Sequence, residues 1–241
     1  AAVHLMQEEL TQMMTGALSV LTKDGVTLVG GHSSEGPEAS LGFAINGYCD
    51  KEKIIRKQGA KESDVLILSK PIGTGVILAA QMQGKARSDF LHTALNIMVQ
   101  SNQQASEIFL RNDVNAMTDV TGFGIAGHLL EMIEKSSLQA TLRSKQIPIL
   151  PGAKHLFEQG LSSSLQSDNF LATEKIFTRD RSHKSIQLNL LVDPQTSGGL
   201  LAAVPSNKAE QCLNDLLKSG YTASMIGEFS VCTGSFPIIL D

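Results

Sequence analysis

The sequence predicts an α/β protein in two parts, a short unit of strands with one helix over residues 1–72 and a layered α/β domain over residues 73–241. Apolar runs of strand length cluster before residue 72, whereas helical and strand-like periods alternate after residue 73. With 42% hydrophobic and 18% charged residues, a chain of 241 residues can bury a large core. We therefore expect a soluble globular protein in which helices pack on sheets.

The first part is expected to begin with an amphipathic helix. Apolar side chains recur every three or four positions from Leu5 to Leu21, and the Asp24-Gly25 pair is typical of the turn that ends such a helix. Short apolar runs bounded by glycine or proline then predict strands. These runs occupy residues 26–31, 41–48 and 63–71.

The second part alternates helices with strands. The periodicity predicts helices at residues 73–83, 88–111, 125–133 and 206–219. Strands are expected at residues 113–117, 138–143, 187–193, 200–205 and 223–229. The polar stretch at 160–185 is expected on the surface, and no internal repeat interrupts this layered pattern.

Composition excludes several classes of protein. A net charge of −4 gives no general attraction to nucleic acid or anionic membrane, and no apolar run approaches the roughly 20 residues of a spanning helix. Cys49, Cys212 and Cys232 show no CxxC spacing, so neither a disulfide framework nor a zinc site is indicated. We expect ordinary thiols in a reduced, cytoplasmic protein.

The first motif is GGHSSEGPE at residues 30–38, directly after an expected strand. Paired glycines, here Gly30 and Gly31, let the backbone approach a ligand, and successive N–H groups in such a turn form an anion-binding nest. Ser33 could donate to a phosphate oxygen. The same residues could equally make an ordinary turn, with His32 as a satisfied polar residue.

The second motif is TDVTGFGIAGH at residues 118–128, where an expected strand turns into an expected helix. Asp119 could cap this turn. It could instead bind a hard cation such as Mg²⁺, which typically takes one or two carboxylates and bridges to phosphates. Gly122 and Gly124 would allow a tight turn into the helix, whose N-terminus carries partial positive charge.

The helix after this turn offers no clear catalytic group. We expect Phe123 to fill the core rather than stack on a base, and His128 to be a polar-face or capping residue without a role. GFGIAG matches the GxGxxG dinucleotide fingerprint, but only Arg143 stands where that fold expects an acid near the next strand end. The sequence also has no GxSxG, HExxH or GxxxxGK[ST] motif.

The third motif is DPQTSGGLL at residues 193–201. Asp-Pro after an apolar run, followed by Ser-Gly-Gly and another apolar run, is typical of a turn between two strands, so hairpin geometry would explain it. Gln195, Thr196 and Ser197 could alternatively present polar groups to a cleft.

The chain closely resembles selenophosphate synthetase (selenide, water dikinase) in five stretches, taken in this order and spacing: VGGHSSEGPE, LSKPIGTGV, TDVTGFGIAGHLLEM, IPILPGA and DPQTSGGLLAAVP. The likeness runs through nearly all 241 residues. That family belongs to the aminoimidazole ribonucleotide synthetase superfamily of ATP-using enzymes. The resemblance implies a remnant of the N-terminal ATP-binding and dimerisation sheet domain at 1–72, followed by the C-terminal α/β sandwich domain of the superfamily at 73–241.

The resemblance also implies roles for particular residues. Asp119 matches the family aspartate that binds Mg²⁺, and the segment that contacts ATP is matched by Gly30, Gly31, His32 and Ser33. Metal ions neutralise phosphate charge in phosphoryl transfer. Family members convert ATP, selenide and water into selenophosphate, AMP and phosphate, and they pair through the first-domain sheet, so a homodimer is expected, with no nucleic-acid or membrane partner.

One departure from the family qualifies these expectations. The family's reactive cysteine or selenocysteine, its lysine and further metal-binding aspartates should precede residue 1, and Cys49 is in the wrong place to be that nucleophile. We therefore expect an N-terminally truncated sequence that is inactive by itself. Two rivals stay open: another synthetase or kinase of the superfamily, acting on a purine or thiamine precursor, and a non-catalytic domain of a larger fusion.

Overall fold

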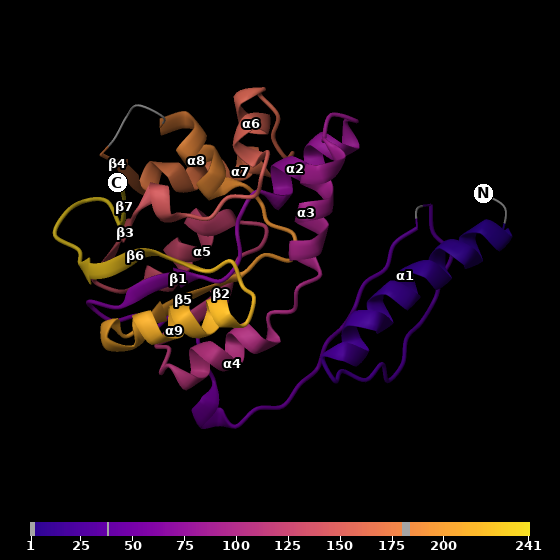
Figure 1. The fold of residues 1–241 in the computed structure, drawn as a ribbon, viewed down its shortest axis with the longest axis horizontal. Helices are drawn as coiled ribbons and strands as arrows, with labels where there is room; N and C mark the ends of the chain where they lie inside the picture. The colour runs from indigo at the N-terminus through magenta and orange to yellow at the C-terminus, as the bar shows by residue number, and fades with distance from the viewer. Residues whose placement is uncertain (1–2, 38, 180–183) are drawn as a thin grey trace. The chain divides into compact units, whose positions relative to one another are not determined.

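The computed structural model describes residues 3–37, 39–179 and 184–241, which divide into two compact units, Ala1–Ile54 and Ile55–Asp241 (Figure 1). The first unit contains α1 (Val3–Lys23), which confirms the expected N-terminal helix, and a 3-10 turn at Lys51–Lys53. Gly25 follows α1 with φ of +70°, as the predicted helix-ending turn requires.

The two strands expected in the first unit do not form. An apolar run becomes a strand only when a neighbouring chain accepts its backbone hydrogen bonds. Within the described part of the chain, residues 26–31 and 41–48 pair with no other segment. The prediction of strands at these two positions is therefore wrong for this structure.

The second unit is built on a sheet that contains seven strands within the described residues, in the order β2-β5-β1-β6-β3-β7-β4. Neighbours from β2 to β3 run antiparallel, whereas β3, β7 and β4 run parallel. The strands are β1 (Val65–Leu68), β2 (Ala116–Asp119), β3 (Leu138–Leu142), β4 (Ile176–Thr178), β5 (Leu200–Val204), β6 (Ser224–Val231) and β7 (Ile238–Leu240).

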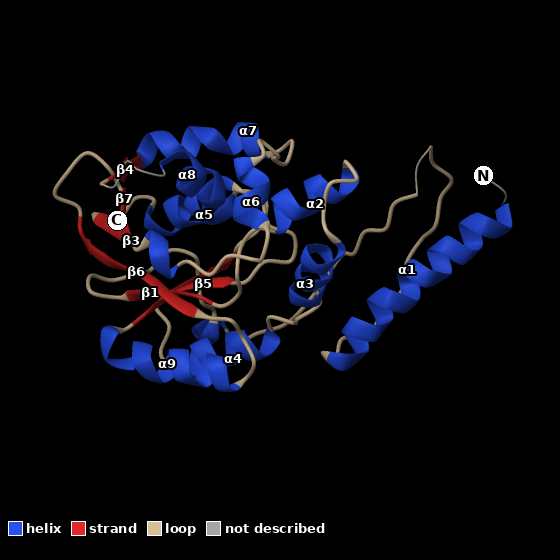
Figure 2. Ribbon diagram, turned by 45° about the horizontal axis from the view of Figure 1, so that its top comes forward, coloured by secondary structure: helices blue, strands red, loops and turns tan. Residues whose placement is uncertain are grey.

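Helices cover both faces of this sheet, which confirms the predicted α/β layers (Figure 2). On one face α4 (Gln103–Arg111) and α9 (Ser206–Lys218) enclose a smaller core with the sheet. The other face carries the larger core. Its helices are α2 (Thr74–Met82), α3 (Ser88–Met98), α5 (Gly124–Ile133), α6 (Ala153–Glu158) and α8 (Lys184–Val192), with the short α7 (Gln166–Asn169) beside α8.

Two expected elements differ in the second unit. Of residues 187–193, expected as a strand, residues 187–192 belong to α8 and Asp193 follows it, because a short apolar run is compatible with a buried strand and with a buried helix segment alike. Residues 88–111, expected as one helix, form α3 and α4, which are separated at residues 99–102. The remaining helices and strands expected within residues 73–229 occur close to their expected positions.

β1 connects the early part of the chain to the sheet. It pairs with β5 on one side and β6 on the other, so residues 65–68 lie in the middle of the sheet of the second unit. The compact units accordingly divide at Ile54 and Ile55, before the boundary at residue 72 that we drew from the sequence. None of the helices in the described residues has both the length and the apolar character needed to cross a bilayer.

Candidate functional site

Asp119 is the last residue of β2, at a strand end as the sequence predicted, and its side chain is exposed. Its backbone lies opposite Leu200 of β5, and the next residue, Val120, is buried and donates its N–H to Gly199 O at 2.9 Å. The main chain around Asp119 is thus fixed by the sheet, whereas the carboxylate faces solvent and is free to bind a ligand.

The turn from β2 into α5 requires glycine at one position. Gly124 has φ of +65°, and a Cβ on it would lie 2.7 Å from Leu191 O and 3.0 Å from Asp193 O. Any other residue would be strained by its backbone conformation and would clash with the end of α8 and the residue after it. Gly122 meets neither condition, so the tight turn that we predicted from both glycines depends on Gly124.

Phe123 is 58% exposed, and the prediction that it fills the core is wrong. Its ring instead lies 5.5 Å from the His128 ring, tilted by 51°. An aromatic side chain is therefore presented at the surface a few residues from Asp119.

His128 is buried and hydrogen-bonded on both sides of its ring, which the sequence did not reveal. Nε2 accepts the backbone N–H of Thr121 at 3.1 Å, and Nδ1 lies 3.2 Å from Glu131 Oε2. Glu131 Oε1 accepts a hydrogen bond from Lys57 Nζ at 2.8 Å. Partial burial raises the pKa of Glu131, but the hydrogen bonds and charges of Lys57 and His128 outweigh it and hold that pKa below its ordinary value.

The segment after α8 joins three parts of the second unit. Gln195 Oε1 accepts hydrogen bonds from Gly73 N at 2.9 Å and from the Thr74 hydroxyl at 3.1 Å, while its Nε2 donates to Asp193 Oδ2 at 2.9 Å. Thr74 also accepts the backbone N–H of Thr196 at 2.9 Å. Gln195 is buried, so it fixes the start of α2 rather than facing a cleft, and the helix α8 before it rules out the expected hairpin.

Asp193 is an uncommon buried carboxyl. Burial raises its pKa to about 7, against hydrogen bonding from Gln195 and against the backbone N–H groups of Val76 and Gly75, which lower it. Oδ1 has no hydrogen-bond partner of good geometry among the described residues, so the N–H groups at the start of α2 act on it mainly through their electrostatic field. Asp193 is therefore a buried group whose titration should make the free energy of unfolding depend on pH.

The side chain of Lys70 is among the largest of the fully buried side chains in the described residues, and it carries an ionisable amine. Its Nζ donates to the carbonyl oxygens of Gln100, at 2.5 Å, and of Ser197, at 3.3 Å, and burial lowers its pKa to about 8. The ammonium group thereby ties the end of β1 to the α3–α4 connection and to the turn before β5.

Gly30, Gly31, His32 and Ser33 lie in the first unit and are exposed. A Cβ on Gly30 or Gly31 would meet no atom within 4 Å, so the backbone here is accessible. Asp119 belongs to the second unit.

The donor set at Asp119 is compatible with Mg²⁺. Among the described residues no group of three or more His, Cys, Asp or Glu side chains is placed to hold a metal ion, so Asp119 contributes one carboxylate. Mg²⁺ is commonly bound through one or two carboxylates, with waters and substrate phosphates as the other ligands. An exposed carboxylate on a rigid strand end meets that requirement.

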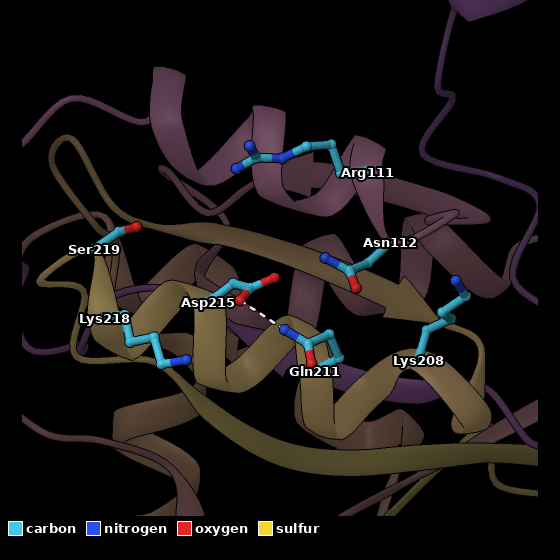
Figure 3. A pocket seen from close by; sticks show the side chains of 7 residues that line it. All are labelled: Arg111, Asn112, Lys208, Gln211, Asp215, Lys218 and Ser219. Atoms are coloured by element: carbon cyan, nitrogen blue, oxygen red, sulfur yellow. Dashed lines mark hydrogen bonds between the residues drawn. The ribbon is translucent and has the colours of Figure 1, made fainter.

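A separate groove of about 430 Å³ lies between α4 and α9, the two helices on the face of the sheet that carries the smaller core (Figure 3). Its lining is Arg111, Asn112, Lys208, Gln211, Asp215, Lys218 and Ser219. Asp215 lies among the cations and accepts a hydrogen bond from Gln211 at 2.8 Å, while Lys208 pairs with Asp113 at 3.7 Å. Because this open groove is lined by both positive and negative side chains, its charge does not indicate one class of ligand.

Comparison with known proteins supports the resemblance found in the sequence. Residues 25–236 match the family model of AIR synthase related protein, C-terminal domain. The chain is 36% identical to selenide, water dikinase of Myxococcus xanthus, covering 91% of this chain and 63% of that protein. It is also 36% identical to selenide, water dikinase of Aeromonas hydrophila, covering 96% of this chain and 66% of that protein.

The chain thus spans slightly less than two thirds of the length of these relatives. Among solved structures, hydrogenase maturation protein HypE superposes with a TM-score of 0.55 at 16% identity, over 77% of this chain and 51% of that one. This likeness shows a shared fold alone.

Proposed function

Since the chain belongs to the AIR synthase related protein family, we propose that it serves in a selenide, water dikinase, which converts ATP, selenide and water into selenophosphate, AMP and phosphate. The observation that carries this proposal is the 36% identity to two selenide, water dikinases over more than 90% of this chain. HypE shares the fold at only 16% identity, so the fold by itself does not select the reaction.

In this proposal Asp119 holds Mg²⁺ at the end of β2. When bound, the ion neutralises negative charge on the phosphate oxygens, which phosphoryl transfer mainly requires. The rigid backbone of β2 fixes the strand end that carries the carboxylate, so little ordering is needed on binding. Gly30 and Gly31 offer accessible backbone N–H groups to phosphate, while His32 and Ser33 offer side-chain donors.

The proposal extends to assembly and location. Selenide and ATP are the expected small-molecule partners, and we expect a homodimer formed through the first unit, where Val29, Ile45 and Tyr48 are exposed. Cys49, Cys212 and Cys232 are all free thiols, which is consistent with the reducing cytoplasm. Light scattering at several concentrations tests the dimer, and a concentration-independent monomer mass contradicts it.

The main alternative is another ATP-dependent synthetase or kinase of the same superfamily, or a non-catalytic domain. Its members share the fold, but the identity above is to selenide, water dikinases. Supplying the chain within its full reading frame with ATP and selenide, and following AMP, separates the reactions. AMP formation that does not depend on selenide would contradict the proposal.

The direct test of the site is calorimetric titration with ATP in the presence of Mg²⁺, on the wild type and on Asp119→Ala. We expect binding that needs Mg²⁺ and weakens about tenfold or more without the carboxylate. Asp168→Ala, which removes another exposed carboxylate, is the matched control and should bind as the wild type does. Equal affinity of Asp119→Ala and wild type would remove Asp119 from the site.

A further inference from the structure

The hydrogen bonds of His128 fix the tautomer of its ring. The backbone N–H of Thr121 can only donate, so Nε2, 3.1 Å from it, must be the unprotonated acceptor nitrogen. The ring proton therefore lies on Nδ1 and is donated to Glu131 Oε2 at 3.2 Å. Glu131 is in turn held by Lys57 Nζ at 2.8 Å, which fixes the acceptor of the Nδ1 proton.

Nε2 of His128 accepts the N–H of Thr121, which lies two residues after Asp119 in the chain. In this segment Val120 N donates to Gly199 O, and Thr121 O accepts the N–H groups of Gln195 at 2.9 Å and of Gly124 at 3.0 Å. Both backbone polar groups of Thr121 are thus anchored. Its N–H donates to Nε2 of His128 in α5, and its carbonyl oxygen is held by Gln195 in the segment after α8.

The carboxylate of Asp119 has no such anchor of its own. No hydrogen bond or ion pair joins it to another residue in the described part of the chain, and the Thr118 hydroxyl, at 3.3 Å, donates to the backbone oxygen of Asp119 and not to its carboxylate. Its position is therefore set by the backbone on either side of it, the paired end of β2 and the turn at Thr121. A loss of the Thr121 anchor would free the turn that follows the strand end and so spread the positions of the carboxylate.

We propose that His128, held in one tautomer by Glu131 and Lys57, is a positioning residue that fixes the Asp119 carboxylate in the orientation that binds the metal. The inference rests on the proposed function, because it assigns His128 to the same site. It differs from a purely structural role, in which His128 fills the space between α5 and the turn and affects stability alone.

The experiment compares three variants with the wild type. His128→Phe keeps a buried ring but removes the acceptor, whereas His128→Gln can return an amide oxygen to the position of Nε2. Leu129→Ala is the matched control, because Leu129 is buried in the same helix and its truncation destabilises the protein without touching Thr121. All binding is measured at a temperature at which circular dichroism shows each variant to be folded.

The first readout is the affinity for Mg²⁺ in the presence of ATP, measured by calorimetry. We expect His128→Phe to weaken it about tenfold, as loss of the support behind a metal ligand commonly does. His128→Gln should recover most of the affinity, and Leu129→Ala should bind as the wild type does. An unchanged affinity in His128→Phe, or equal losses in His128→Phe and Leu129→Ala, would overturn the proposal.

The second readout does not depend on metal. Hydrogen exchange of the Thr121 amide, with ¹⁵N relaxation of residues 119–124, reports whether the turn is anchored by His128. We expect faster exchange and larger amplitude in His128→Phe than in Leu129→Ala. If the wild type binds no Mg²⁺ in the presence of ATP, the proposed function fails, but this readout still shows whether His128 anchors the turn. A turn as rigid in His128→Phe as in Leu129→Ala would overturn the proposal for His128.

Discussion

The buried carboxyl of Asp193 predicts an unusual dependence of stability on pH. Its pKa is about 7 in the folded protein against an ordinary value of 3.8, so between these pH values the folded state binds more protons than the unfolded state. Stability must then fall as pH rises through this window, because unfolding releases the penalty of burying the charge. Replacement by asparagine removes the charge and keeps an acceptor for Gln195 Nε2.

The magnitude follows from the two pKa values. The difference between 3.8 and about 7, at about 1.36 kcal/mol for each pH unit, corresponds to about 4 kcal/mol at most. About 3 kcal/mol of this falls between pH 5 and pH 8. The free energy of unfolding of the wild type should therefore fall, relative to that of Asp193→Asn, by roughly this amount across that interval.

Urea denaturation of both proteins at several values from pH 5 to pH 8 measures this difference, since titration of all other groups is common to the two. Asp168→Asn is the control, because its carboxylate is exposed and its pH dependence should follow the wild type. Parallel pH curves for the wild type and Asp193→Asn would refute the reasoning, and so would a difference of the opposite sign.

Three further predictions concern the second unit. Gly124→Ala should cost about 2–3 kcal/mol, from φ of +65° and a clash with Leu191 O, whereas Gly122→Ala, with open space around it, should change the urea midpoint little. Lys70 has a pKa lowered from 10.5 to about 8 by burial, so the unfolded state binds the extra proton between these values and wild-type stability should rise with pH there. Lys70→Met should lack this rise, and thermal melts at pH 7.5 and 10 that shift alike in both proteins would contradict it. Phe109→Ala in the core under α4 should lose about 3–5 kcal/mol, while Leu110→Ala, 44% exposed, should lose less than about 1 kcal/mol by the same denaturation assay.

Elements with a distinct period could be predicted from the sequence. α1, α5 and α9 show apolar positions every three or four residues, and β1 and β5 are short apolar runs ended by Pro71 and Pro205. The apolar run at 187–193 is compatible with either a strand or a helix, and only its packing against α5 and α6 decides for α8. β7 has three residues, too few to show a period.

The site shows the same limit. Asp119 could be placed at a strand end because the residues around it have local signals, whereas the contact of Lys57 with Glu131 joins positions 74 residues apart and leaves no trace in either neighbourhood. A signal for His128 did exist. It stands three residues after Ile125 and four before Met132, both buried, so the helical period places it on the apolar face, where a polar ring needs partners.

The position of β1 determines when the fold can be completed. Val65 pairs with Val204 on one side and with Glu228 on the other, so both strands that pair with β1 are synthesised long after β1 itself. Until then its apolar residues Leu66, Ile67 and Leu68, which the finished protein hides completely, have no sheet to join. Such long-range pairing slows folding and exposes intermediates to association. The two neighbours of β1 are thus absent until β5 and then β6 have been synthesised.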